Sequence, residues 1–351
     1  MFEGGSFIRE NYTLQTELTG KFNTGAIAHQ LLLGVELNRN TRWLDFAEAG
    51  LPTIDIFNPD YTIERPGELV TSYQEVTSTN TLGIYVQDQV TLDNNLKLLV
   101  GGRFDAATQK SDFPLDGTNS EQSDNAFSPR IGIVYQPILP LSLYASHSRS
   151  FTPVVGRSRT NALFDPQRGT QDEVGIKADL SDRVSATLAA YQITKTNVLT
   201  TDPEDPDFSV QVGKQRSRGI ELDVAGELSP GWNMIASYAY TNSITSEDNI
   251  VVGNRLNNVP QNAASLWTTY EIQRGNLRGL GFGLGLYYVS DREADVENTA
   301  TLPGYFRTDA SIFYKRDRWR FALNFRNLCN EKYCETAQGR DIIYPGAPFT
   351  I

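Results

Sequence analysis

The sequence lacks several features on which common protein classes depend. It has only two cysteines, Cys329 and Cys334, among 351 residues, which excludes a disulfide framework and a four-cysteine zinc site. Their spacing permits one small disulfide loop, and it also permits two unpaired thiols at a strand end. No stretch of the chain approaches the roughly 18 to 20 consecutive apolar residues of a transmembrane helix. The sequence therefore excludes an α-helical membrane protein.

Positive charge is also scarce. The formal net charge is −11, and binding to nucleic acid depends on clustered Lys and Arg side chains that neutralise phosphates. We therefore expect no nucleic-acid partner. The first residues contain neither the basic segment nor the apolar segment of a secretory signal. Either the protein is cytosolic, or its true N-terminus is absent from this sequence.

Residues that carry catalysis are few. The two histidines, His29 and His147, fall in register with apolar residues, so we expect them to face outward without partners. A catalytic triad or a metal site needs several convergent side chains. We therefore expect no enzyme activity, no catalytic residue, no metal site and no cofactor.

What the sequence does contain is alternation with period two, in segments of about ten residues or more. In 319–326, Trp, Phe, Leu and Phe alternate with Arg, Ala, Asn and Arg, and the segments 218–224 and 97–105 follow the same rule. Aromatic residues occur on the apolar faces and just after short turns, as in the interfacial belts of membrane barrels. The pattern predicts an all-β protein whose strands have one apolar face and one charged face.

The connections between these segments fall into two alternating classes. Short turns of a few residues, such as 181–183 and 229–231, alternate with long polar connections, such as 38–78 and 196–214. A soluble β-sandwich has no reason to place every short turn at one end of its strands. An outer-membrane barrel has short periplasmic turns and long extracellular loops. The sequence therefore predicts an antiparallel outer-membrane β-barrel with its charged residues facing the lumen.

One strand, GLGFGLGLYYV (279–289), has glycine at every second position and large apolar residues between. Its glycine face is nearly bare, and two explanations remain open. Either an object inside the barrel packs against this face, or the glycines relieve the curvature of the sheet.

One long connection, residues 149–170, is unusually rich in arginine: it contains Arg149, Arg157, Arg159 and Arg168 but only one acidic residue, Asp165. Arginine binds carboxylates and phosphates in a bidentate manner. Three explanations of this segment are therefore open: it binds an anionic ligand, it contacts lipopolysaccharide phosphates, or it is a solvated loop. We predict that its ligand contacts are Arg149, Phe151, Arg157 and Arg159.

Eight ordered motifs carry a resemblance to a known family. They are GIYVQDQVTL (83–92), LLVGGRFD (98–105), FSPRIGIVYQP (127–137), LSLYASHSRSFTP (141–153), YQITKTNVLT (191–200), RSRGIELDVAGEL (216–228), WNMIASYAYTNS (232–243), and NLCNEKY with YPGAPFT (327–350). Together they resemble the C-terminal part of TonB-dependent siderophore receptors of the ferrichrome and hydroxamate type. The resemblance implies a 22-stranded barrel in the Gram-negative outer membrane, plugged by an N-terminal domain. It also implies a ferric siderophore as cargo, the TonB complex as energy source, and lipid and lipopolysaccharide as neighbours.

The sequence departs from that family at both ends. We count about fourteen strands from Tyr12 onward, plus a stub of a further strand at 347–351. We therefore expect residues 1–351 to be one part of an incomplete barrel, with the plug, TonB box and signal peptide absent. Cys329 is a further departure from the family pattern. Three alternatives remain: a plugless passive porin, a non-functional remnant of a receptor gene, and a secreted soluble all-β binding protein.

Overall fold

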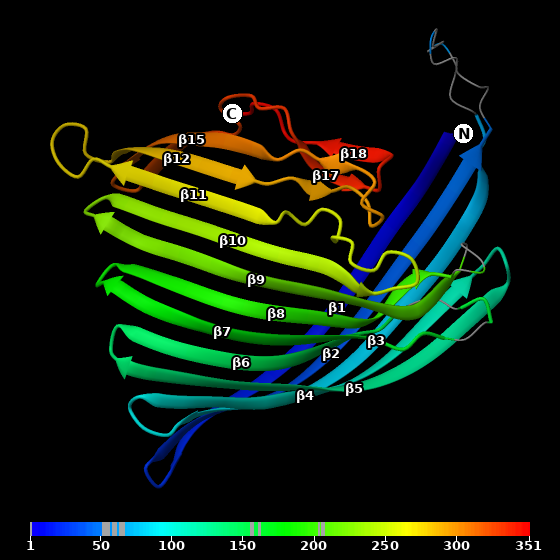
Figure 1. Cartoon of the computed structure of the whole chain (residues 1–351), viewed down its shortest axis with the longest axis horizontal. Helices are drawn as coiled ribbons and strands as arrows, with labels where there is room; N and C mark the ends of the chain where they lie inside the picture. Colours follow the sequence, from blue (N-terminus) through cyan, green and yellow to red (C-terminus); the bar gives the residue numbers. More distant parts are fainter. Residues whose placement is uncertain are drawn as a thin grey trace.

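The computed structural model describes residues 2–50, 57, 62, 67–154, 158–160, 163–202, 204 and 208–351. Its main feature is one antiparallel sheet of fourteen strands, in the order β1 to β12, then β15 and β16 (Figure 1). Two small hairpins, β13–β14 and β17–β18, stand beside it. No helix of the described residues is long and apolar enough to cross a membrane. The predicted all-β antiparallel architecture and the number of strands are confirmed.

The strands of the sheet become shorter toward the C-terminal end. They are β1 (Phe2–Thr24), β2 (Ile27–Ala49), β3 (Val70–Thr91), β4 (Leu96–Phe113), β5 (Thr118–Ile138), β6 (Leu141–Thr152), β7 (Gln167–Ser181), β8 (Val184–Thr201), β9 (Ser209–Ser229), β10 (Trp232–Glu247), β11 (Asn262–Glu271), β12 (Leu280–Val289), β15 (Tyr305–Arg316) and β16 (Trp319–Phe325). The small hairpins are β13 (Arg292–Glu293) with β14 (Thr301–Leu302), and β17 (Cys334–Gln338) with β18 (Ile342–Pro345).

Short turns lie at one end of the sheet, and the other end carries the long connections together with the tight turn between β4 and β5 (Figure 1). We call these ends the turn side and the loop side. The asymmetry is as predicted, but the strands continue far into segments that we expected to be loops. The connection expected at 109–125, for example, is mostly strand and turns only between Phe113 and Thr118. Likewise β1 begins at Phe2, well before the expected start at Tyr12.

The reason is physical. A strand with polar surroundings on both faces keeps its ladder of backbone hydrogen bonds but no longer needs an apolar face. Alternation therefore disappears from the sequence before the strand ends.

The two faces of the sheet differ as predicted. On the outer face, large apolar side chains are exposed on strand after strand, including Leu33, Ile84, Val100, Ile131, Val174 and Ile220. Trp232 and Trp319, next to turns, are also exposed. The inner face is polar: Arg103 on β4 lies 2.9 Å from Glu36 of β2 and 2.7 Å from Asp105. Such alternation places lipid outside and water or protein inside.

Aromatic rings cover the glycines of β12. A Cβ at Gly281 would collide with the ring of Phe313 on β15, and one at Gly285 would lie 2.7 Å from the ring of Trp267 on β11. The same arrangement recurs where Tyr85 of β3 covers Gly34 of β2. The space over the glycine face is therefore filled by side chains of adjacent strands. This is a third explanation, beside the two that the sequence left open.

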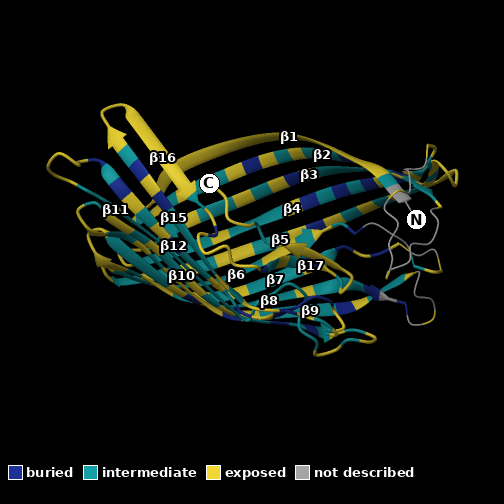
Figure 2. Cartoon of the chain, turned by 90° about the horizontal axis from the view of Figure 1, so that it is seen from above, coloured by how far each residue is buried: buried dark blue, intermediate teal, exposed yellow. Residues whose placement is uncertain are grey.

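The sheet does not close. It curls into an open wall (Figure 2), and its edge strands β1 and β16 are not paired with each other in the described residues. The expected C-terminal stub is present: the backbone of Thr350 exchanges hydrogen bonds of 2.9 and 3.1 Å with Arg326, just after β16. Cys329 and Cys334 are both unpaired thiols.

Candidate functional site

A groove of about 360 Å³ lies on the inner wall, across β9 to β12 and β15. Small residues form its floor, and two different walls flank it. Glu221 and Asp223 of β9 form the acidic wall, and β12 and β15 provide the aromatic and cationic wall. The inner-face residues are Glu221, Asp223, Ser237, Ala239, Ala263, Ser265, Tyr287, Val289, Tyr305 and Arg307. Small side chains at the centre are what leave room for a ligand.

The guanidinium of Arg307 is held in this groove by contacts with three other side chains. Its guanidinium carbon lies 4.4 Å from the ring centroid of Tyr287, and its Nε and Nη2 each donate to Asp309 over 3.1 Å. Nη1 donates to the Tyr333 hydroxyl over 3.4 Å, and the rings of Tyr305 and Tyr333 are stacked 4.3 Å apart. A guanidinium held against one aromatic ring and the hydroxyl of another in this way is suited to bind planar, oxygen-rich anions.

Three loop-side segments fold over this part of the wall and form a cap, which comprises residues 248–261, 291–304 and 330–346. Arg255 bonds Asp291 over 3.2 Å and Glu293 over 3.1 Å. The amide of Asn258 exchanges two hydrogen bonds of 2.8 Å with the backbone of Ala337. A small apolar cluster of Ala294, Leu302 and Ala337 lies beneath.

Arg292 joins two segments of the cap. It is only 2% exposed, and its Nη2 donates to the carbonyls of Cys334 and Glu335 over 2.6 and 2.8 Å. Its guanidinium carbon lies 5.6 Å from the ring centroid of Tyr305. The cap is thus held mainly by side chains that bond backbone groups.

Asp295 stabilises the turn between β13 and β14 in the segment 291–304. Its carboxylate accepts hydrogen bonds from the backbone of Thr299 over 2.8 Å and of Ala300 over 3.0 Å. These bonds, the one from Thr299 above all, hold the pKa of the Asp295 carboxyl below its usual value against the opposing effect of burial.

Of the sequence-predicted ligand residues, two lie on β6 and a third lies in the connection between β6 and β7. Arg149 and Phe151 belong to β6 and alternate with His147, which pairs with the exposed outer residue Ile131, so both are on the outer face. Arg159 forms ion pairs with Glu204 and, over 3.7 Å, with Asp202. Arg157 lies outside the described residues. Their role in binding stays a prediction.

The groove residues escaped the sequence analysis because each is an ordinary strand residue. Tyr287 and Arg307 are neighbours only through the pairing of β12 with β15. A tyrosine and an arginine at inward positions near the loop side of two consecutive strands were the available signal.

The expectation that the histidines lack partners is wrong. His29 Nδ1 lies 2.7 Å from Asp88 Oδ2, and His147 Nδ1 lies 2.7 Å from Asp172 Oδ1. Each aspartate comes from the neighbouring strand, on the outer face. Cross-strand register decides such pairs, and register is not readable from one segment alone.

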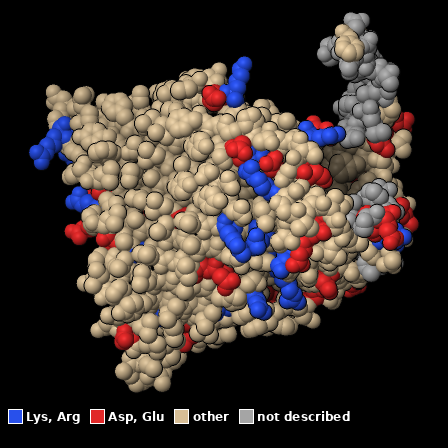
Figure 3. Space-filling view, viewed as in Figure 1, with Lys and Arg blue, Asp and Glu red and all other residues tan. Residues whose placement is uncertain are grey.

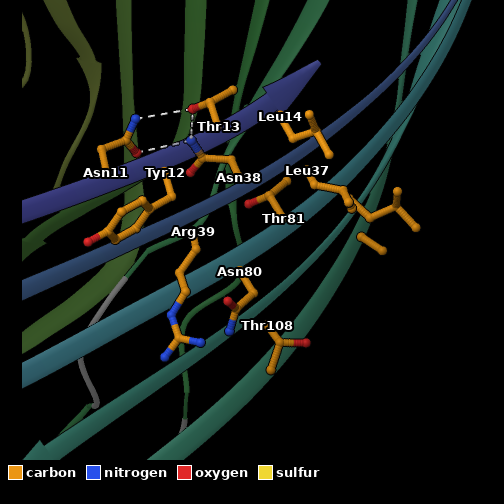
Figure 4. A pocket seen from close by; sticks show the side chains of 12 residues that line it. Asn11, Tyr12, Thr13, Leu14, Leu37, Asn38, Arg39, Asn80, Thr81 and Thr108 are labelled. Carbon is orange, nitrogen blue, oxygen red and sulfur yellow. Dashed lines mark hydrogen bonds between the residues drawn. The ribbon is translucent and has the colours of Figure 1, made fainter. Parts of the chain in front are cut away.

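A second groove, of about 810 Å³, lies on the outer face of β1 to β4 (Figure 4). Its polar row follows the strand register from Tyr12 through Arg39 and Asn80 to Thr108. Directly below lies a row with Leu14, Leu37 and Leu82. The groove therefore marks the border between the apolar band and the polar part of the outer face.

Comparison with known proteins decides the family. The TonB dependent receptor-like, beta-barrel family matches residues 2–328. The chain belongs to this family. The apolar outer face is accordingly the lipid-facing wall of a protein of the Gram-negative outer membrane.

Several curated relatives are receptors or transporters. The chain is 34% identical to the metal-pseudopaline receptor CntO of Pseudomonas aeruginosa, over 95% of this chain and 49% of that protein. It is 34% identical to the ferrichrome outer membrane transporter/phage receptor of Escherichia coli, over 92% of this chain and 45% of that protein. The chain thus spans about half the length of the curated relatives it matches.

Solved structures share the fold. The ferric-catecholate import receptor Fiu of E. coli superposes with a TM-score of 0.83 at 24% identity, over 97% of this chain and 53% of that one. The siderophore receptor PiuA of Acinetobacter baumannii gives a TM-score of 0.84 at 23% identity, over 98% of this chain and 55% of that one. At these identities the likeness shows the fold alone.

Proposed function

We propose that the chain forms the C-terminal part of the barrel wall of an outer-membrane receptor that imports ferric siderophores with energy from TonB. The family match over residues 2–328 carries this proposal. Relatives named for ferrichrome and ferrioxamine B support a ferric chelate as substrate, and the relative named for metal-pseudopaline supports a metal chelate more generally. Iron then enters as part of the cargo, and the protein needs neither a resident cofactor nor a catalytic residue.

The inner groove is our candidate contact surface for that cargo. Tyr287 and Tyr305 offer aromatic surface, and Arg307 offers a positive charge that is already held in place. Ferric siderophores present oxygen ligands around the metal, and a fixed guanidinium beside aromatic rings fits such a surface. Glu221 and Asp223, on the opposite side of the groove, disfavour anions that lack the matching shape.

A passive porin is the weaker alternative. A pore in lipid needs a closed wall, because each unpaired backbone group in hydrocarbon costs several kcal/mol. The two edges of the described sheet, β1 and β16, are not paired with each other. We therefore favour a receptor whose wall is completed by further strands and whose lumen is plugged, in contact with TonB, outer-membrane lipid and lipopolysaccharide.

The test is uptake of radioactive iron under iron limitation. Cells with and without the gene for this chain receive iron-55 in the form of ferrichrome, of ferrioxamine B or of its complex with pseudopaline. We expect loss of uptake of at least one complex, and the same loss when TonB is deleted.

Variants then locate the contact. R307A and Y287A should lower uptake at least fivefold, whereas K97A, a cation on the inner face near the turn side, should leave it within twofold. Unchanged uptake of every complex after gene deletion contradicts the transport proposal. Equal loss in all three variants contradicts only the groove assignment.

A further inference from the structure

We propose that the outer face of β1 to β3, near the loop-side ends of these strands, binds a neutral sugar of a glycan at the cell surface. The site is a groove of about 350 Å³ around Trp43, separate from the two grooves described above. The inference goes beyond the proposed transport function and does not depend on it, because it needs only that the loop side faces the outside of the cell. We call the site the Trp43 groove; its outer-face lining is Ser6, Ile8, Glu10, Trp43, Asp45, Gln74 and Val76.

Strand register brings apolar residues back onto the outer face after the lipid-facing band has ended. The last row of that band is Leu14, Leu37, Leu82 and Ala106. Toward the loop side follow two polar rows, which are Tyr12, Arg39, Asn80 and Thr108, and then Glu10, Thr41, Ser78 and Lys110. The next row is Ile8, Trp43, Val76 and Asp112, and the one beyond it is Ser6, Asp45 and Gln74. A largely apolar row thus stands between polar rows.

This apolar row is too far from the membrane to contact lipid. Three steps of about 7 Å separate it from the last row of the band, which makes roughly 20 Å along the strands. With a strand tilt of about 40°, the height is about 15 Å, whereas the headgroup layer is only about 6 Å thick. In Figure 3, too, a broad band without charged side chains fills much of the turn-side half and ends well before the loop side. Lipid therefore does not explain this row.

The side chains around Trp43 have the chemistry of a sugar-binding site. Trp43 is half-buried between Val76 and Ile8, and Ile8 is 53% exposed. An indole ring offers a large flat apolar surface, against which the C–H face of a sugar ring can pack. Within the described residues, the side chains of Asp45 and Gln74 make no hydrogen bond or ion pair. Their oxygens are therefore available to accept hydrogen bonds from sugar hydroxyls.

The charge around the groove disfavours an anionic ligand. Glu10, Asp45 and Asp112 form no ion pair in the part of the chain that the structure describes. The cation of the adjoining row, Lys110, is paired with Glu121 over 3.0 Å. A phosphate or carboxylate ligand would therefore meet three carboxylates and no free cation in the adjoining rows. A neutral ligand rich in hydroxyl groups can instead donate hydrogen bonds to these carboxylates.

The experiment measures binding of two neutral trisaccharides, maltotriose and chitotriose, to the outer-membrane protein purified in a detergent without a sugar headgroup. Titration calorimetry should detect binding of at least one of them. Trp43→Ala should weaken that binding at least tenfold, because buried tryptophan anchors dominate the affinity of binding sites. Trp43→Phe keeps a ring and should lose less. Asp45→Asn should weaken binding about fivefold, since a bond to a charged acceptor becomes a bond to a neutral one.

The matched control is Trp319→Ala, which removes an exposed tryptophan from the same face at the turn side and should leave binding within twofold. Binding of a neutral sugar should also change less than twofold between about 0.05 and 0.5 M NaCl, because no charge on the ligand is screened. Binding of neither trisaccharide overturns the proposal, and so does equal loss in the Trp43→Ala and Trp319→Ala variants.

Two further probes test the other classes of ligand. Tetralysine represents a cationic ligand, and lipopolysaccharide represents a lipid-borne one. Competition by tetralysine that is lost in Asp45→Asn but kept in Trp43→Ala would assign the groove to a cation and overturn the proposal. Binding of lipopolysaccharide alone, without either free trisaccharide, would overturn it as well. Iron uptake is not measured here, so this result and that of the transport test can fail independently.

Discussion

Strands β2 to β5 and strands β11 to β16 reach the loop side by different means. In the first region the strands themselves are long, 23 residues in β2 and 22 in β3, and every step is held by the backbone ladder. In the second region β11 and β12 have only 10 residues each. There the cap of folded segments continues the wall, and side chains such as Arg255, Asn258 and Arg292 hold it.

Because the two regions are held by different contacts, they should be sensitive to different kinds of substitution. A wall built from a backbone ladder tolerates side-chain changes and fails when a backbone donor is lost. A cap built on side-chain contacts fails when one buried side chain is removed. Substitutions in the two regions separate these two cases.

The largest effect is expected from Thr79→Pro in β3, whose residue pairs with Asn40 on one side and Gln109 on the other. Proline removes a ladder donor and clashes with the neighbouring strand, so the free energy of unfolding should fall by about 3 kcal/mol or more. Unfolding by urea in lipid vesicles measures this free energy of unfolding. Thr79→Val keeps the ladder and should change the value by less than about 1 kcal/mol; a similar loss in both variants would show that the ladder is not the cause.

Arg292→Ala should open the cap and spare the wall. The substitution leaves the carbonyls of Cys334 and Glu335 without their donor, a loss of about 2–3 kcal/mol for bonds to a charged group. Hydrogen exchange should accelerate in 291–304 and 330–346 but not in β3 or β4. Lys332→Ala, an exposed cation of the same segment, serves as the control. Faster exchange in β3 would contradict the independence of the two regions.

Gly281→Leu tests the ring that covers β12. The new side chain would collide with Phe313, and overpacking of this kind costs about 1–3 kcal/mol. A compensating change, Phe313→Ala, should make the leucine less harmful than it is alone, which a double-mutant cycle detects. Additive effects of the two changes would argue that the ring does not occupy that space.

The smallest effect is expected from pH. The pKa of Asp295 is lowered in the folded cap, so its stabilising contribution is complete above the usual aspartate pKa and is lost as pH falls through the lower folded value. Hydrogen exchange of 291–302 should therefore accelerate below about pH 4. Asp295→Asn should remove the pH dependence in this segment, and a persistent acid transition in that variant would assign it to another group.

Much of the wall could be predicted from the sequence, because period-two alternation is a local signal. Strand faces, turn asymmetry and the fourteen strands all follow from it. The loop-side extensions could not be predicted, since the sequence of the loop-side part of β2, 38–49, has no alternation to reveal the strand.

Features that depend on register or on tertiary contact were also out of reach. Asp88 and Asp172 beside the histidines, the ring of Phe313 over Gly281, and the groove of Tyr287 and Arg307 all join different strands. Arg149 illustrates the limit well. Its chemistry was recognisable, but only strand pairing shows that it faces outward.

The wall has a lipid-facing and a lumen-facing side in the outer membrane, and adjacent positions on one strand test this arrangement most directly. In a Cys329→Ser/Cys334→Ser background, Ile220→Cys and Glu221→Cys are labelled in intact outer membranes with a lipid-soluble and with a water-soluble thiol reagent. We predict that the cysteine at 220 reacts only with the lipid-soluble reagent and the one at 221 mainly with the water-soluble one. Equal reaction of both positions with the water-soluble reagent would contradict the assignment of the two faces.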